Sequence, residues 1–294
     1  MSIRVLIAGK HGQLAWELAR TVPSDLNVIW LSSLEMDISQ ANEVKKQVQA
    51  HRPHVVVNAA AYTQVDKAET EQAQAFSVNA NGVLHLAQAC NEVNARLIHI
   101  STDFVFDGAK SSPYLPSDSP NPLGVYGKSK LEGERLAQEV MPCNNLLILR
   151  TSWLYSSHGR NFVKTILRLA SANGPLRVVC DQVGSPTWAY DLAQAVWHAV
   201  LRPEVHGVHH FSNAGVASWY DMAVAVVEEA VRLGLLVEER EVVPIPNHAY
   251  PTPAKRPHYS VLNCLETWNC LGIAPVHWRK RLFNMLTEFK GNMS

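Results

Sequence analysis

The sequence predicts an α/β protein built on a doubly wound parallel sheet, followed by a smaller C-terminal α/β substrate domain. Short β-branched, apolar runs alternate with helical patterns through the first half of the chain. The first run, Ile3–Ala8, leads directly into a glycine turn and a helix. A later run, Leu97–Phe106, contains a polar tip of the kind found where a parallel strand opens onto a ligand crevice. Together these features indicate a Rossmann-type sheet.

Composition limits the classes of function. The chain has 294 residues with 47% hydrophobic residues, enough for one large domain or two closely joined ones. We expect residues 1–152 to form the Rossmann domain, with a returning segment near 176–205, and residues 153–294 to form mainly the substrate domain. The 26 basic and 26 acidic residues cancel without forming a charged block, which argues against a nucleic-acid partner.

Cysteine usage and hydropathy predict the compartment. The five cysteines are an odd number without Cys-x-x-Cys spacing, so we expect reduced thiols rather than disulfides or a zinc site. No apolar run reaches the length of about 20 residues that spans a membrane, and no basic leader precedes Ile3. The expected location is the cytoplasm, with no membrane partner.

The glycine turn is the first candidate ligand site. The stretch Gly9-Lys-His-Gly-Gln-Leu-Ala15 connects the first strand to a helix. Backbone amides and a helix N-terminus at such a turn can face a pyrophosphate. The spacing lacks one glycine of the fuller fingerprint, and a tight turn without ligand is the alternative interpretation. If the turn does bind a dinucleotide, Gly9 and Gly12 allow the close backbone approach.

The end of the second strand bears on the choice of nicotinamide. Leu26–Leu31 is followed by Ser32 and Ser33, where many dinucleotide folds carry an acidic residue that contacts the ribose and repels a 2′-phosphate. We therefore predict a preference for NADPH, leaving NADH use open. Asp37, slightly further on, is predicted either to lie near the adenine or to cap a helix that starts around Gln40.

The third strand, Val55–Ala61, ends in small side chains against which a flat cofactor can lie. Tyr62 and Thr63 follow it directly. A long helix is then expected over Gln74–Val93; its Asn79 is interpreted either as a site residue or as an ordinary surface amide. These residues extend the candidate cofactor site along the sheet edge.

The central prediction is a reduction site formed by the polar strand tip Ser101-Thr-Asp103 and the helix that starts near Tyr126. Tyr126 and Lys130 are one helical turn apart and share a face. A carbonyl that accepts a hydride also needs a proton, and a phenol becomes a usable acid when a cation stabilises its phenolate. The pair alone is a weak signal, because a Tyr-x-x-x-Lys spacing also arises by chance.

The remaining segments predict the rest of the fold. The proline-rich stretch Ser111–Pro122 is expected to be a loop over the site, and Leu146–Tyr155 a further strand. Helices are expected over Phe162–Ala172, Tyr190–Leu201, Trp219–Gly234 and part of the last thirty residues, with short strands at Leu176–Cys180 and Gly207–Ser212. A proline-framed basic loop spans Ala249–Pro257.

Several motifs together resemble the dTDP-4-dehydrorhamnose reductase family of extended short-chain dehydrogenase/reductases. The resemblance covers nearly the whole chain. Its most specific segments are Arg150-Thr-Ser-Trp153 and Tyr250-Pro-Thr-Pro-Ala-Lys-Arg-Pro257, and it also includes Gly9–Leu18, Asn58–Glu69, Ser101–Gly108, Pro122–Glu134 and Asp181–Thr187. It implies NADPH-dependent reduction of the 4-keto group of dTDP-4-dehydro-β-L-rhamnose, with the dTDP-sugar as the small-molecule partner.

The resemblance also implies roles for individual residues. Tyr126 would donate the proton, Lys130 would bind the nicotinamide ribose and lower the pKa of Tyr126, and Thr102 would orient the carbonyl. The implied substrate contacts are Asp103, Trp153 and Arg256, with ordinary packing as the alternative for Trp153 and an interdomain contact for Arg256. The implied cofactor contacts are Gly12, Gln13, Leu14, Asp37, Ile38, Ala61, Tyr62 and Thr63, together with Ser32 at the second-strand tip.

Other interpretations stay open at this point. Some members of the family require Mg²⁺ at a subunit contact, which would imply a homodimer, but no carboxylate cluster can be assigned to the ion. A non-catalytic relative, the regulatory subunit of methionine adenosyltransferase, keeps this fold and binds NADP. An epimerase or dehydratase would need further acid/base residues beside Thr102, and the sequence has Asp103 alone there.

Overall fold

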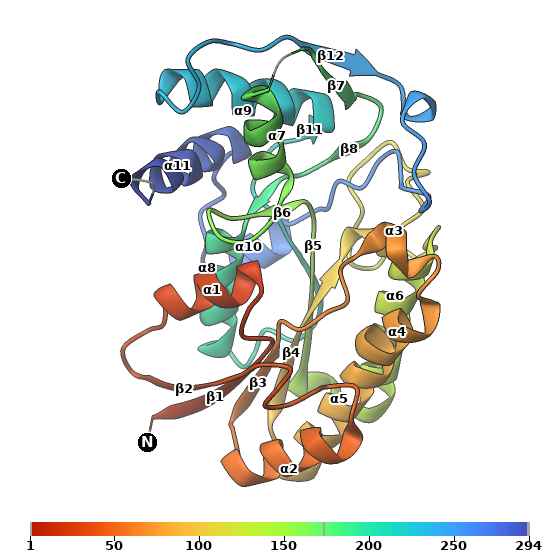
Figure 1. Ribbon diagram of the computed structural model, residues 1–294. Coiled ribbons are helices and arrows are strands. Elements are labelled where there is room, and N and C mark those ends of the chain that lie inside the picture. Colours follow the sequence, from red (N-terminus) through yellow and green to blue (C-terminus); the bar gives the residue numbers. More distant parts are fainter. Residues whose placement is uncertain (1, 173, 293–294) are drawn as a thin grey trace.

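A computed structural model describes residues 2–172 and 174–292 (Figure 1). In the described chain, six parallel strands form the central sheet in the order β10-β5-β4-β3-β1-β2. Their bounds are Ile3–Ala8 for β1, Leu26–Leu31 for β2, Val55–Asn58 for β3, Arg96–Thr102 for β4, Leu146–Thr151 for β5 and Gly207–Phe211 for β10. The expected doubly wound sheet is confirmed, and the order of strands reverses direction between β1 and β3.

Helices cover both faces of this sheet (Figure 1). One face packs against α2 (Ala41–His51), α5 (Gly82–Val93) and α6 (Val125–Val140). The other packs against α1 (Gln13–Arg20), α8 (Ala189–Val200) and α10 (Leu265–Leu271). Along β1 the side chains alternate between the two layers: Val5 and Ile7 belong to one apolar cluster and Leu6 to the other.

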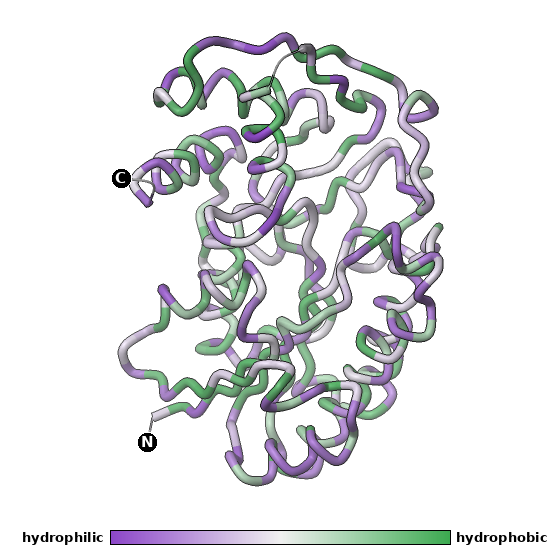
Figure 2. The backbone as a smooth tube through the Cα atoms, viewed as in Figure 1, coloured by the Kyte–Doolittle hydropathy of each residue, from purple (hydrophilic) through white to green (hydrophobic). Residues whose placement is uncertain are grey.

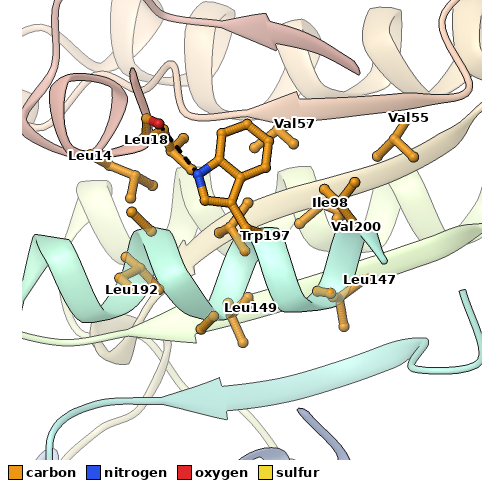
Figure 3. Packing of buried hydrophobic residues seen from close by; sticks show 14 of the residues in the cluster. Leu14, Leu18, Val55, Val57, Ile98, Leu147, Leu149, Leu192, Trp197 and Val200 are labelled. Carbon is orange, nitrogen blue, oxygen red and sulfur yellow. Dashed lines mark hydrogen bonds between the residues drawn. The ribbon is translucent and has the colours of Figure 1, made fainter. Parts of the chain in front are cut away.

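The cluster on the α8 face is centred on Trp197 (Figure 3). Its ring is 1% exposed and packs among Leu14, Leu18 and sheet residues that include Val57 and Ile98. The indole Nε1 donates to the Leu18 carbonyl at 3.3 Å. This packing fixes α1, and with it the glycine turn, against the sheet.

The remaining elements build a second unit beyond the carboxyl ends of the sheet, at the top of Figure 1. Its apolar core is shared by α7 (Phe162–Ala170), α9 (Trp219–Arg232) and α11 (Trp278–Gly291). The strand pairs are β7 with β12 (Leu176–Val179 and Val242–Ile245), β6 with β9 (Leu154–Tyr155 and Thr187–Trp188), and β8 with β11 (Val183–Gly184 and Ala217–Ser218). The chain returns to the central sheet through α8 and β10, whereas β7, which lies inside the expected returning segment, pairs with β12.

Several elements are shorter or more divided than the sequence pattern indicated. The strand expected to reach Ala61 ends at Asn58, and the strand expected to reach Phe106 ends at Thr102, followed by a 3-10 turn, Asp103–Val105. The helix expected over Gln74–Val93 is split into α4 (Gln72–Phe76), a π-helical turn (Ser77–Asn81) and α5.

Other segments differ because local contacts end a regular element. The strand expected over Leu146–Tyr155 leaves the sheet after Thr151, because Trp153 adopts φ 47° and redirects the chain toward β9. The short helix α3 (Val65–Ala68) and 3-10 turns at Cys143–Asn145 and Asn247–Ala249 complete the fold.

Polarity follows this architecture. In Figure 2 the strands of the central sheet are largely hydrophobic in colour and α2 is largely hydrophilic. On α2 only Val44 and Val48 are buried among its described side chains. Within residues 2–172 and 174–292, no helix is both long and apolar enough to cross a membrane.

The packing of Trp197 generates a stability prediction. Trp197→Ala should lower the free energy of unfolding by about 3–5 kcal/mol, because it removes a large buried side chain and leaves a cavity under α1. Denaturant unfolding followed by circular dichroism measures this change. Val237→Ala, at an exposed position, is the control and should change stability by less than about 0.5 kcal/mol. Equal effects of the two substitutions would contradict the importance of this cluster.

Candidate active site

A groove lies at the carboxyl ends of β1, β2 and β3, where the strand order reverses. Parallel-sheet proteins bind ligands at this position. The groove is lined by Gly9–Gly12, Ser33, Met36–Ile38, Ala59–Tyr62, Gln74 and Val78. Gly9 has φ 100°, and a Cβ there would come within 2.8 Å of the Ala60 backbone, so a side chain would close the turn onto the third strand.

The groove fits a dinucleotide. Helix α1 begins after Gly12, and no side chain of the described chain caps its N-terminus. A Cβ at Gly12 would meet no atom within 4 Å, so the space in front of these amides is open. Free first-turn N–H groups and the helix dipole are suited to bind a pyrophosphate. The expected phosphate site is thus present in its backbone geometry.

The predicted cofactor residues do not all occupy this groove. Gly9, Gly12, Asp37, Ile38, Ala61 and Tyr62 line it. The Leu14 side chain lies in the sheet core, so only its backbone can face a ligand. The Gln13 amide oxygen accepts from Asn161 at 2.9 Å, which ties the turn to the start of α7. Thr63 is exposed just beyond the groove.

The tip of the second strand carries a carboxylate that we did not expect. Glu35 accepts from the Ser32 backbone N–H at 2.8 Å and from its hydroxyl at 2.7 Å. These two bonds, followed by the nearby charges of Lys10 and His11, hold the pKa of Glu35 below its usual value. The expectation that no acidic group is present at this tip was wrong, because a Ser-x-x-Glu turn folds the carboxylate back onto Ser32.

Asp37 lies in the groove and does not cap α2. The residue that precedes this helix is Gln40, and α2 receives no side-chain cap from the described residues. The Asp37 carboxylate instead accepts from the Ser39 N–H at 2.9 Å, forming a local turn. Of the two interpretations that the sequence left open, the capping one was wrong.

The helix α6 starts at the carboxyl end of β4 and carries Tyr126 in its first turn. The Glu69 carboxylate accepts from the Val125 N–H at 2.9 Å and so caps this helix. A Cβ at Gly127 would come within 2.2 Å of the Phe104 carbonyl oxygen, so glycine permits α6 to contact the backbone after β4. The Tyr126 ring meets the Phe104 ring edge-on, with centroids 5.6 Å apart.

Thr102, Asp103 and Tyr126 come together as the sequence predicted. Burial raises the pKa of Tyr126 to about 12, a hydrogen bond with Thr102 lowers it, and the charge of Asp103 raises it. The Thr102 hydroxyl donates to Asp103 Oδ1 at 3.1 Å. Asp103 Oδ2 is buried without a partner in the described chain, and burial raises the pKa of this carboxyl to about 6. The half-buried Tyr126 and the buried side chains of Thr102 and Asp103 therefore surround one point at the strand end.

Lys130 lies one turn below Tyr126 but binds elsewhere. Its Nζ donates to the Ile100 carbonyl at 2.8 Å and lies 3.3 Å from His99 Nε2. Burial lowers the pKa of Lys130 to about 8, opposed by the charge of Glu134. The expected lowering of the Tyr126 pKa is not seen in this arrangement, because burial raises the pKa of the phenol while Lys130 Nζ is bound to the Ile100 carbonyl.

Asn79 explains how the cofactor side and α6 are joined. It lies in the π-helical turn and is 1% exposed. Its side chain binds the Tyr62 N–H at 2.9 Å, the Tyr62 carbonyl at 3.0 Å and the Ser129 hydroxyl at 3.0 Å. The surface-amide interpretation was therefore wrong, and the amide holds the groove-lining loop against α6.

Trp153 lies at the junction with the second unit. Its backbone has φ 47°, unusual for a bulky residue, and its ring stacks on Trp219 with centroids 3.5 Å apart and planes 3° from parallel. Trp219 lines a second pocket. The stacked pair forms an aromatic wall between the end of β5 and this pocket; the structure shows packing by Trp153, and its contact with a ligand stays a prediction.

The second pocket lies between α7, β7 and the proline-framed loop. It is lined by Asp66, Phe162, Thr165, Ile166, Leu169, Leu176–Val179, Gln182, Trp219, Asn247, Tyr250, Thr252 and Arg256. Arg256 donates to Asp66 at 2.8 Å and also bonds Thr252. The Arg256 guanidinium therefore lies at the second pocket. It is also bound to the Asp66 carboxylate, which comes from the segment after β3.

Within the described ranges, no three His, Cys, Asp or Glu residues lie together in a way that could hold a metal ion. The five cysteines, all described, are free thiols.

Sequence reasoning missed several residues of the site. Glu35 and His99 contact the predicted site residues Ser32 and Lys130, and Glu69 caps the helix that carries Tyr126. For Glu35 a signal existed in the Ser-x-x-Glu spacing from Ser32. Glu69 and His99 gave no comparable signal, because their partners are 56 and 31 residues away in the chain.

Comparisons with known proteins identify the family. Residues 3–290 match the family model described as the RmlD substrate binding domain. The dTDP-4-dehydrorhamnose reductase of Aggregatibacter actinomycetemcomitans is 42% identical over 96% of this chain and 98% of its own. The Escherichia coli K12 enzyme of the same name is 41% identical over 97% of this chain and 98% of its own.

Solved structures give the same result. A dTDP-4-dehydrorhamnose reductase from Bacillus anthracis in complex with NADP superposes with a TM-score of 0.91 at 33% identity, covering 98% of this chain and 100% of that one. A UDP-glucose 4-epimerase from Thermus thermophilus reaches 0.81 at 21% identity, covering 98% of this chain and 99% of that one, which shows the shared fold alone. The chain therefore belongs to the dTDP-4-dehydrorhamnose reductase family of extended short-chain dehydrogenase/reductases.

Proposed function

We propose that the protein reduces the 4-keto group of dTDP-4-dehydro-β-L-rhamnose to give dTDP-β-L-rhamnose, with NADPH as the cofactor. The observation that carries this proposal is the convergence of Tyr126, Thr102 and Asp103 at the end of β4, beside the dinucleotide groove. One segment links the two cavities, because Tyr62 lines the groove and Asp66 lines the second pocket.

The positions of these residues indicate which part of the chain would bind each ligand. NADPH, when bound, supplies the hydride. The residues of the groove, mostly within 1–152, would hold it, while the unit formed mainly by residues 153–294 would hold the dTDP-sugar. Arg256 offers a guanidinium fork for the diphosphate, and the aromatic wall of Trp153 and Trp219 would contact the flat or apolar parts of the ligand. We infer a cytoplasmic location from this biosynthetic role.

The proton chemistry falls to Tyr126. With a pKa of about 12 the phenol is protonated throughout the neutral range, so it can donate to a carbonyl oxygen that becomes an alkoxide. The Thr102 hydroxyl can hydrogen bond the same oxygen and the phenolate that remains. Ionised Asp103 opposes formation of that phenolate, and it loses its charge as the pH falls through about 6.

Turnover tests the proposed reaction. The purified protein is mixed with NADPH and the 4-keto sugar, and the product is identified by mass spectrometry and NMR. Formation of the 4-hydroxy sugar supports the proposal. NADPH binding without any turnover would favour a non-catalytic NADP-binding protein, and a change of configuration or loss of water without net oxidation of NADPH would favour an epimerase or dehydratase.

Replacement of the proton donor gives a sharper prediction. Tyr126→Phe should lower kcat by about 10²–10⁴-fold, the usual effect of losing a general acid, with little change in NADPH affinity. Tyr190→Phe is the matched control, since that phenol lies on α8 beside Arg20 and away from the site. Near-normal turnover in Tyr126→Phe would exclude Tyr126 as the acid.

Glu35 determines how far NADPH is preferred. Its carboxylate can accept a hydrogen bond from a ribose 2′-OH, while Lys10 and His11 in the neighbouring turn can face a 2′-phosphate. We propose that both nicotinamides are used and that Glu35 limits the preference for NADPH. Ser32 acts through Glu35, because its N–H and hydroxyl hold the carboxylate.

Substitution of Glu35 tests this assignment. Glu35→Gln removes the negative charge and keeps the size, so the ratio of kcat/KM for NADPH over NADH should rise about fivefold, because a 2′-phosphate no longer meets a like charge. Steady-state kinetics with each cofactor measure the ratio. Glu92→Gln, which breaks a surface pair with Lys45, should leave it unchanged. An unaltered ratio in Glu35→Gln would show that another group senses the 2′ position.

A further inference from the structure

A buried histidine of β4 lies directly beneath the candidate site. His99 is 0% exposed and is paired in register with Asn58 of β3. Its Nδ1 lies 3.1 Å from Asn58 Nδ2, and its Nε2 lies 3.3 Å from Lys130 Nζ. The family resemblance implies that Lys130 binds the nicotinamide ribose, whereas neither His99 nor Asn58 has a task in the proposed reaction.

The hydrogen bonds fix where the proton of His99 resides. Asn58 Oδ1 accepts from the Ala60 N–H at 3.1 Å, so its NH₂ group faces the ring and donates to Nδ1. Burial holds the pKa of His99 well below its ordinary value, so the ring is neutral. A neutral ring that accepts at Nδ1 carries its single proton on Nε2.

The Nε2–H of His99 therefore points at Lys130 Nζ. An ammonium group has three donors and no acceptor, and two donors cannot share one hydrogen bond. A neutral amine keeps a lone pair, which can accept from Nε2–H while one of its own hydrogens is donated to the Ile100 carbonyl at 2.8 Å. The hydrogen bonds around Lys130 therefore favour the neutral amine over the ammonium.

Nearby charges do not restore the ammonium. Glu134, one turn further along α6, is the nearest carboxylate on the helix, but it is committed to Arg150 at 2.6 Å and to Ser101. The titratable and charged groups around Lys130 and Tyr126 come from several elements. The end of β4 contributes His99 and Asp103, α6 contributes Glu134, and β5 contributes Arg150. The segment before α4 contributes Glu69, Glu71 and Tyr62.

We propose that Asn58 and His99 are positioning residues that favour the neutral amine of Lys130 in the cofactor-free protein, so that at alkaline pH cofactor binding returns Lys130 to the ammonium form by uptake of one proton from solvent. The cofactor brings negative phosphates and ribose hydroxyls that favour a cation. The step forms one N–H bond at Nζ, ends the contact with His99 Nε2–H, and leaves the conjugate base of the buffer in solution. This inference rests on the proposed use of a nicotinamide dinucleotide.

The pH dependence follows from the sign of the change. Free Lys130 has a pKa of about 8, and the bound ammonium should have a higher one. Binding takes up protons only at a pH between the two pKa values of Lys130. Below both values Lys130 is charged in the free and in the bound protein, and above both it is neutral in each. Uptake should therefore be near zero at about pH 6.5 and approach one proton at about pH 9.

Calorimetry measures this uptake without any turnover. NADP⁺ is titrated into the protein at each pH in two buffers with different ionisation enthalpies, and the slope of the observed enthalpy gives the number of protons. Uptake of close to one proton at the alkaline pH supports the proposal. Normal NADP⁺ binding without alkaline uptake overturns it, and that result would leave the proposed reduction, which is measured by product formation, unaffected.

Two substitutions test whether the proton uptake depends on Asn58 and His99. His99→Gln places a carbonyl oxygen opposite Lys130, which lets the free protein keep an ammonium, so alkaline uptake should fall to less than half. Asn58→Leu removes the donor at Nδ1 and allows the other tautomer of His99, with the same expected fall. His198→Gln on α8, a half-buried histidine bonded to the Leu271 carbonyl, is the control and should retain full uptake. Unchanged proton uptake in both His99→Gln and Asn58→Leu would overturn the role of these two residues.

Discussion

The contact between helix α6 and strand β4 is the constraint on which the site depends. Three residues of α6 at helical spacing meet the strand or its end: Gly127 approaches the Phe104 carbonyl, Lys130 reaches the Ile100 carbonyl, and Glu134 binds Ser101. Each contact lies one helical turn, or nearly so, from the next. The helix can therefore take only one height and one rotation on the strand, and this places Tyr126 beside Thr102.

The energetics of the contact between α6 and the sheet explain why it contains charged groups. Glu134 and Arg150 form a bidentate ion pair with both side chains at most 4% exposed. Loss of one partner from such a pair typically costs about 3–5 kcal/mol, because the other charge stays buried. An apolar pair could hold the layers together equally well, but it would not fix their register. The ion pair joins α6 to β5 while Ser101 joins it to β4, so the strands and the helix are aligned together.

Much of this arrangement follows from sequence periodicity, and some of it does not. The strand ends, the glycine turn and the shared face of Tyr126 and Lys130 depend on local spacing, which the sequence displays directly. The direction in which Lys130 points depends on His99, whose place in an apolar strand gives no sign of its partners. The carboxylate at Ser32 depends on a turn whose spacing resembles a helix start.

Contacts between distant segments were the hardest to anticipate. Asp66 and Arg256 are 190 residues apart and meet because the second unit folds back over the end of the sheet. Trp153 and Trp219 stack because φ 47° at Trp153 turns the chain away from β5. Neither follows from the spacing of residues along one element, so the sequence could indicate that these residues belong to a site but not how they hold one another.

The segment after β3 shows how cofactor and substrate sites are coupled in space. It starts in the dinucleotide groove, where Asn79 holds the Tyr62 backbone by two hydrogen bonds. It then presents Asp66 to the arginine of the second pocket, and its Glu69 caps the helix that carries the proton donor. Because these three contacts lie within eight residues, a displacement of the segment at one cavity must move the helix start and the other cavity with it. Chemistry at Tyr126 is in this way tied mechanically to both binding sites.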